Sequence, residues 1–179
     1  MAAENATVNG ATRGGHDPRL KDVVAYLCDN YPRSQDLSNA RLTKMVYLAD
    51  WKSAIERARQ LTGLTWEFNH YGPYVPDVVR MARKEEGFTV ETGRNAYGEP
   101  RDLIRHMPEA ADNAGDYPSL AAEDRKLLDF VINSVKDKNF QEFIKLVYST
   151  YPIVTSDRYS KLDLVPLARD YAEVAPLLG

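Results

Sequence analysis

The chain has 179 residues, of which 44% are hydrophobic, and a formal net charge of -3. This length is typical of one domain that can bury a sizeable core. The mild acidity, without a long run of basic residues, argues against strong nonspecific binding to nucleic acid. Cys28 is the one cysteine of the sequence, which excludes an intrachain disulfide and a zinc site built from cysteines.

Targeting and membrane signals are missing from the sequence. No apolar run comes near the roughly 18 residues that a membrane helix needs, and no signal-peptide pattern is present. We therefore expect a cytoplasmic protein without a membrane partner. Residues 1–16 have almost no bulky apolar side chain, which predicts a disordered tail or, alternatively, a partner-binding segment. Residues 17–179 are expected to form a single domain.

Two helices are predicted at the start of this domain. Asp17 and Pro18 form a typical helix start, and an apolar stripe follows until the Tyr31-Pro32 step ends the helix. Ser38 is the expected cap of a second helix that runs to about Arg59. Apolar residues occupy two opposed faces of this second helix, which predicts the central helix of a small domain.

Aromatic residues and a turn follow the second helix. Residues 65–68 alternate aromatic and polar side chains, as a short strand does. Gly72, followed by Pro73, predicts a sharp turn, and Pro76 then suits the first turn of a helix. Residues 88–92 and 101–106 are expected to pair as a hairpin around a turn-rich loop.

The C-terminal part is predicted to be mostly helical. A polar linker over residues 109–118 precedes a helix capped by Ser119. Asn139 and Glu142 form a capping-box pattern for a further helix with Phe140 among its inward residues, ended by Pro152. A last helix covers residues 163–174. The predicted fold is therefore mainly α (α+β), a compact helical domain with a small antiparallel sheet or hairpin between the N-terminal and C-terminal helices.

The sequence contains no local catalytic, phosphate-binding or metal-ligand motif. The histidines at positions 16, 70 and 106 are far apart in the sequence. His70 has two interpretations: a base oriented by Asp50, or a hydrogen-bonded structural residue beside the turn. We expect a protein without enzymatic activity, cofactor or metal.

Asp50 lies in the middle of the central helix, where aspartate has a poor helix propensity. One hypothesis is a structural carboxylate that accepts hydrogen bonds from the following turn, from backbone N–H groups near Tyr71 or from His70. The other is an exposed anion that recognises a basic group on a partner.

Aromatic and basic side chains around the turn are the remaining candidates for a partner-binding surface. Tyr71 and Tyr74 belong to an aromatic cluster that fits either a core or an interface. Arg80 and Arg83 follow on the outer face of the next helix, where they fit either a solvated face or a surface that steers a charged partner. With Asp50, Trp51 and His70 they form the predicted partner-binding set, and Gly72 with Pro73 forms the structural turn.

The stretch from Leu42 to Asp50, then Leu61-Thr62-Gly63, then Trp66 to Pro73 resembles the Panacea domain, also called the SocA-like antitoxin domain. That family has a leucine-rich helix ending in Tyr-x-Ala-Asp, a Thr-Gly step, an aromatic segment and a Tyr-Gly-Pro turn. The resemblance is strongest over residues 38–87. The segment Tyr148 to Ile153 departs from the family's Thr-His pair and Pro-Trp step.

This resemblance implies an antitoxin that neutralises a co-expressed protein toxin by direct binding. The toxins of the family are diverse and include alarmone-synthetase-like enzymes. The family's founding member instead delivers its toxin to an energy-dependent protease, which makes a proteolytic adaptor the alternative. A further alternative is a DNA-binding autoregulator, but the apolar second helix has few side chains suited to reading bases, so a nucleic-acid partner is not expected.

Overall fold

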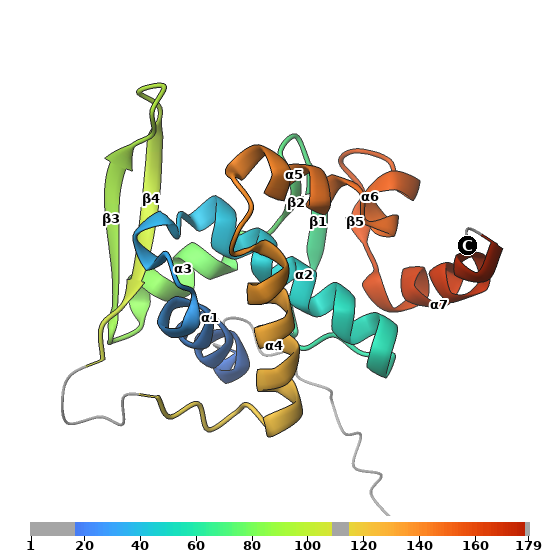
Figure 1. The fold of residues 1–179 in the computed structure, drawn as a ribbon, viewed down its shortest axis with the longest axis horizontal. Coiled ribbons are helices and arrows are strands. Elements are labelled where there is room, and N and C mark those ends of the chain that lie inside the picture. Colours follow the sequence, from blue (N-terminus) through green and yellow to red (C-terminus); the bar gives the residue numbers. More distant parts are fainter. Residues whose placement is uncertain (1–16, 109–114, 178–179) are drawn as a thin grey trace, which may run out of the picture.

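A computed structural model describes residues 17–108 and 115–177 of the chain. The fold is mainly α with two small antiparallel sheets, which confirms the predicted fold class (Figure 1). The disorder predicted for residues 1–16 and most of the predicted linker fall outside the described residues, and the single-domain boundary stays a prediction.

The helices are α1 (Pro18–Asn30), α2 (Asn39–Arg57), α3 (Asp77–Lys84), α4 (Ala122–Val135), α5 (Phe140–Tyr148), α6 (Tyr151–Thr155) and α7 (Leu164–Val174). Two short 3-10 turns are η1 (Ser34–Asp36) and η2 (Ala175–Leu177).

Helix α2 runs through the middle of the molecule, with α1, α3, α4 and α7 around it (Figure 1). One predicted apolar face is fully buried, at Leu42, Met45, Val46 and Ala49. The prediction holds in part for the opposite face, where Trp51 is buried but Ile55 is 42% exposed. The Ser38 Oγ accepts a hydrogen bond from the backbone N–H of Arg41 at 3.2 Å, as a helix cap does. The prediction of a central helix capped by Ser38 is therefore confirmed.

Helix α1 begins and ends where the sequence predicted. The Asp17 carboxylate accepts from the backbone N–H of Arg19 at 3.0 Å, and Pro18 occupies the first turn. Tyr31 is extended, because a residue before proline disfavours helical geometry. The apolar stripe of α1, which includes Cys28, is buried.

Strand β1 (Trp66–Asn69) lies between β2 (Gly72–Tyr74) and β5 (Lys161–Leu162) in an antiparallel sheet. Gly72 has a φ of +94°, which confirms the sharp turn. The helix predicted near Pro76 is also confirmed, since α3 begins at Asp77, and residues 72–74 pair with β1 before it. Strand β5 was not predicted, because two residues give no alternation to detect.

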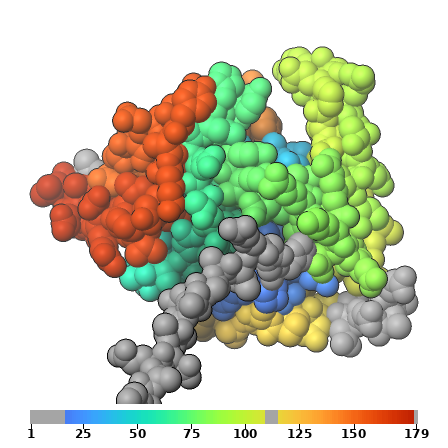
Figure 2. All heavy atoms as spheres, turned by 180° about the vertical axis from the view of Figure 1, so that it is seen from behind, coloured from blue at the N-terminus to red at the C-terminus, as the bar shows by residue number. Residues whose placement is uncertain are grey.

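Strands β3 (Phe88–Arg94) and β4 (Pro100–His106) form the predicted hairpin. The hairpin projects from the body of the molecule, and its tip stands apart from the helices (Figures 1 and 2). Its base is held by the segment before α2: the Ile104 N–H donates to the Leu37 carbonyl at 3.0 Å. Ile104 itself is fully buried. The hairpin is thereby fixed relative to the start of α2.

Ser119 does not cap α4, contrary to the prediction. Its backbone N–H and its hydroxyl both donate to Asp22 on α1, at 2.7 and 2.6 Å. Helix α4 starts three residues later, and Asp124 accepts from the backbone N–H of Ala121 at 3.0 Å. The Ser119 hydroxyl, which the local pattern predicted to cap a helix, therefore makes a tertiary contact with α1 instead.

The capping box of α5 is confirmed, with reciprocal hydrogen bonds of 2.9 Å between Asn139 and Glu142. Two other predictions for this region are wrong. Phe140 is 49% exposed rather than inward, because it sits in the first turn, where the helix has not yet reached the core. Pro152 does not end α5, which stops at Tyr148; it lies in the first turn of α6, a position that tolerates proline.

Replacing Gly72 tests the turn. A Cβ atom at this position would lie 3.0 Å from the Tyr148 ring, and the positive φ strains any side chain. We expect Gly72→Ala to lower the free energy of unfolding by about 2 kcal/mol, measured by urea denaturation. Gly93→Ala is the matched control, since a Cβ there meets nothing within 4 Å. Equal stability of the two variants would show that the turn is not under this constraint.

Candidate functional site

The Asp50 carboxylate connects α2 to the segment that follows it. One oxygen accepts from the backbone N–H of Thr62 at 2.7 Å, and the other from the Thr62 hydroxyl at 2.6 Å. The second oxygen also accepts from the Trp66 indole N–H at 2.8 Å and from the Gln60 amide at 3.3 Å. Asp50 therefore fixes the position of the 60–64 loop and of β1 relative to the central helix.

Asp50 is completely buried, so the hypothesis of an exposed anion at this position is wrong. Asp50 is a structural carboxylate that accepts hydrogen bonds, as the other hypothesis stated. Its donors, however, are Gln60, Thr62 and Trp66 rather than groups near Tyr71 or His70. Burial raises the pKa of the carboxyl from 3.8 to about 6, and the hydrogen bonds from Thr62 and Trp66 oppose this rise. The donors of Asp50 therefore stabilise its negative charge against the effect of burial.

The hydrogen bonds of Asp50 continue into a buried aromatic network. Trp66 is fully buried, and its ring lies edge-on to Tyr47 at a centroid distance of 5.5 Å. The Tyr47 hydroxyl shares a hydrogen bond of 2.8 Å with Thr150, the residue that precedes α6. Trp51 is 7% exposed and packs on Tyr171 of α7 at 5.8 Å. This network links α2, β1 and the C-terminal helices.

The other predicted site residues lie nearer the surface. Tyr71 is 72% exposed at the tip of the β1–β2 turn, where its ring contacts exposed His70 at 4.9 Å. Tyr74 is half-buried. Among the hydrogen bonds of the described residues, none joins His70 to Asp50, so nothing here supports the pair as a catalytic unit.

Arg80 and Arg83 are exposed on the outer face of α3. The Arg83 guanidinium donates to the Asp102 carboxylate on β4 at 2.8 Å, which ties the helix to the hairpin. Pro73 is buried beneath the turn. Partner contact by any of the predicted residues stays a prediction.

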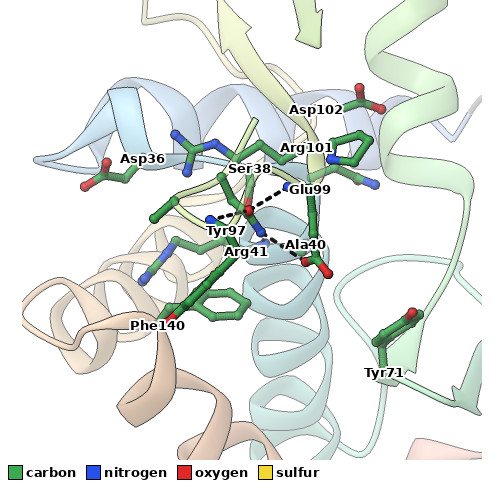
Figure 3. A pocket seen from close by; sticks show the side chains of 14 residues that line it. Asp36, Ser38, Ala40, Arg41, Tyr71, Tyr97, Glu99, Arg101, Asp102 and Phe140 are labelled. Carbon is green, nitrogen blue, oxygen red and sulfur yellow. Dashed lines mark hydrogen bonds between the residues drawn. The ribbon is translucent and has the colours of Figure 1, made fainter. Parts of the chain in front are cut away.

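An open groove of about 960 Å³ lies between the hairpin tip, the start of α2, the start of α5 and the β1–β2 turn. In Figure 2 the hairpin and the β1–β2 turn are two projections with a hollow between them. Three aromatic side chains stand around it: Tyr71, Tyr97 at 87% exposure, and Phe140 (Figure 3). Of the predicted site residues, Tyr71 belongs to this lining.

The remaining groove residues were missed because they come from distant parts of the sequence. Tyr97 lies in a turn-rich loop, and an aromatic residue in such a loop is the sequence signal that indicates its exposure. The amphipathic pattern of α5 placed Phe140 in the core. Arg41 and Arg101, which also line the groove, carry no local pattern that would bring them together.

These features define a class of protein: a mainly helical domain with a buried central helix and an open groove flanked by exposed aromatic side chains. Among residues 17–108 and 115–177, no helix has both the length and the apolar content needed to cross a membrane.

Residues 42–152 match the family described as "Antitoxin SocA-like, Panacea domain". This match covers more than half of the chain, which therefore belongs to that family, as the resemblance implied. Comparison with curated proteins gives no match, and comparison with solved structures gives none. The matched range includes Asp50 and the three aromatic residues of the groove.

The titration of Asp50 gives a pH test. A carboxyl with a pKa raised by folding contributes most to stability below the unfolded-state pKa, and this contribution is lost as pH rises through the folded-state pKa. Relative to Asp50→Asn, the wild-type free energy of unfolding should therefore fall between pH 4 and 7. Taking the change from 3.8 to about 6, the fall is about 3 kcal/mol at most.

The measurement is urea denaturation of both proteins across this pH range. Asp50→Asn should be less stable than wild type overall, because its amide donors face the donors of Thr62 and Trp66. Asp170→Asn, at an exposed position of α7, is the control and should follow the wild-type pH dependence. Parallel curves for wild type and Asp50→Asn would contradict the assigned titration.

Proposed function

We propose that this antitoxin-family protein neutralises a cognate protein toxin by direct binding, and that the aromatic groove is the centre of the binding surface. The observation that supports this most is the exposure of Tyr71, Tyr97 and Phe140 around one groove. Aromatic side chains are enriched at protein interfaces, where they contribute much of the binding energy.

The surroundings of the groove suit a preformed binding surface. The β1–β2 turn is fixed to α2 through Asp50, and the base of the hairpin is fixed through Leu37. A surface held in its bound shape loses less conformational freedom on association. Four residues then contribute without touching the toxin, by holding Tyr71 in position: Asp50, Trp51, Gly72 and Pro73.

A stable interface buries about 1,200–2,000 Å² in total, so neighbouring surface must take part as well. His70 and Tyr74 flank the turn, and Arg80 and Arg83 lie on the adjacent helix α3. We assign them to the periphery of the interface, where charged groups affect association rates more than affinity.

In this proposal the protein acts stoichiometrically in the cytoplasm and has no enzymatic activity. An alarmone-synthetase-like enzyme is one class of toxin that fits. Adaptor activity would appear as a shorter toxin lifetime in cells, whereas direct neutralisation leaves the toxin present and bound. DNA binding through α2 is disfavoured, because a recognition helix must expose base-reading side chains and α2 is buried along most of its length.

Co-expression with the toxin encoded in the adjacent reading frame tests this proposal. Wild type should restore growth and co-purify with the toxin. Tyr97→Ala combined with Phe140→Ala should weaken binding by about tenfold or more, because truncating a central interface residue costs upward of about 1.4 kcal/mol. The melting temperature should stay within about 2 °C, since both side chains are exposed.

Phe130→Ala is the matched control, because Phe130 is 54% exposed on α4 and does not line the groove. It should neutralise the toxin like wild type. A toxin that remains active at saturating wild-type protein would refute neutralisation. Full neutralisation by the double variant would show that the toxin binds a surface other than the groove.

A further inference from the structure

Arg41 is a buried cation beside the groove without a carboxylate partner among the described residues. The side chain is 6% exposed, and its guanidinium donates to the Tyr31 hydroxyl at 3.2 Å. Its charged end lies over the Phe143 ring at 4.8 Å and near the Phe140 ring at 5.9 Å. Neither a hydroxyl nor an aromatic ring neutralises the charge, so this guanidinium can still bind an anion.

Arg101 is the second cation in the lining of the groove. It lies on β4, paired across the hairpin with Gly93. Its Nε atom is buried and has no hydrogen-bond partner in the described structure. A buried donor without an acceptor is uncommon in folded proteins, so a group that accepts a hydrogen bond here would satisfy Arg101.

The acidic residues of the lining differ from the arginines, because each already has a partner. Asp102 accepts from Arg83 and from Thr92, both at 2.8 Å. Glu99 accepts from Asn95 at 3.2 Å, and Asp36 lies 3.8 Å from the Arg33 guanidinium. Each carboxylate of the lining therefore has a polar partner, whereas no carboxylate binds Arg41 or Arg101 among the hydrogen bonds and ion pairs of the described residues.

We propose that the groove binds an acidic segment of the partner protein, with an aspartate or glutamate carboxylate on Arg41 and Arg101 and an apolar neighbour against Tyr97 and Phe140. This proposal rests on the proposed function and specifies its partner's chemistry. Guanidinium groups suit carboxylates because their donors match the two carboxylate oxygens. A singly charged carboxylate fits better than a phosphate, since Asp36, Glu99 and Asp102 would repel a more highly charged group.

The first experiment does not need the toxin. Random peptides displayed on phage are selected for binding to the full-length protein. The proposal expects enriched peptides that carry an acidic residue beside an aromatic or aliphatic one, and their binding should fall by about tenfold or more with Arg101→Glu, a loss typical of a charged contact. Arg169→Glu, an equal charge change at an exposed position of α7, should leave binding within about twofold, as distant surface changes do.

Changing the acidic residue of a selected peptide to its amide should weaken binding to the wild-type protein. Changing the same peptide residue to lysine should restore binding to the Arg101→Glu variant. Circular dichroism and the melting temperature check that Arg101→Glu folds. Arg41→Lys, which keeps the charge but loses the planar fork, should also weaken binding. Peptides without acidic enrichment, or unaffected by Arg101→Glu in a folded protein, would overturn the proposal.

Further measurements distinguish other ligands of the groove, and they test its acidic specificity separately from the proposed function. Displacement of the peptide by inorganic phosphate at constant ionic strength would overturn the assignment in favour of a phosphate site. A wild-type dimer that Arg101→Glu dissociates in sedimentation would assign the groove to a second copy of the chain. An acidic peptide that binds through Arg101 but does not compete with the toxin would uphold the acidic specificity of the groove and refute its role in neutralisation.

Discussion

The four hydrogen bonds to the buried Asp50 carboxylate are the interaction on which the arrangement of this domain depends. They join the central helix to Gln60, Thr62 and Trp66, and hence to the first strand of the small sheet. A buried carboxylate is unfavourable unless donors surround it, so the loop after α2 has to adopt the conformation that supplies them. Trp66 then contacts Tyr47, whose hydroxyl reaches Thr150 near the C-terminal helices.

A second buried aspartate, Asp124, shows how the surroundings decide whether the pKa of a buried carboxyl rises or falls. Burial disfavours the charge of Asp124, but hydrogen bonds from Arg57 and from the Ala121 N–H outweigh this effect, and the pKa of the carboxyl lies below its ordinary value. Asp50 accepts from neutral donors, with no cation bound to it among the described residues, and burial raises its pKa. Acidification therefore weakens the contact of Asp124 with α2, while protonation of Asp50 relieves the desolvation of its charge.

In the proposed function, this internal framework gives the small domain a binding surface of fixed shape. The anchors at Asp50 and Leu37 are buried, whereas the groove between the β1–β2 turn and the hairpin is lined by exposed aromatic side chains (Figures 2 and 3). In the proposed function, the framework keeps the shape of the surface, and the lining side chains select the toxin. Substitutions in the lining can then change the partner without unfolding the domain.

Local patterns in the sequence determined the helices and the hairpin, because caps, apolar periodicity and proline act over a few residues: Asp17, Ser38 and Asn139 cap the helices as predicted. The family also followed from its motifs. Tertiary structure decided which donors surround Asp50, that Ser119 binds Asp22 instead of capping a helix, and that Phe140 faces outward. It also decided the groove, since Arg41, Tyr71, Arg101 and Phe140 become neighbours through packing of distant segments, and no local pattern encodes that packing.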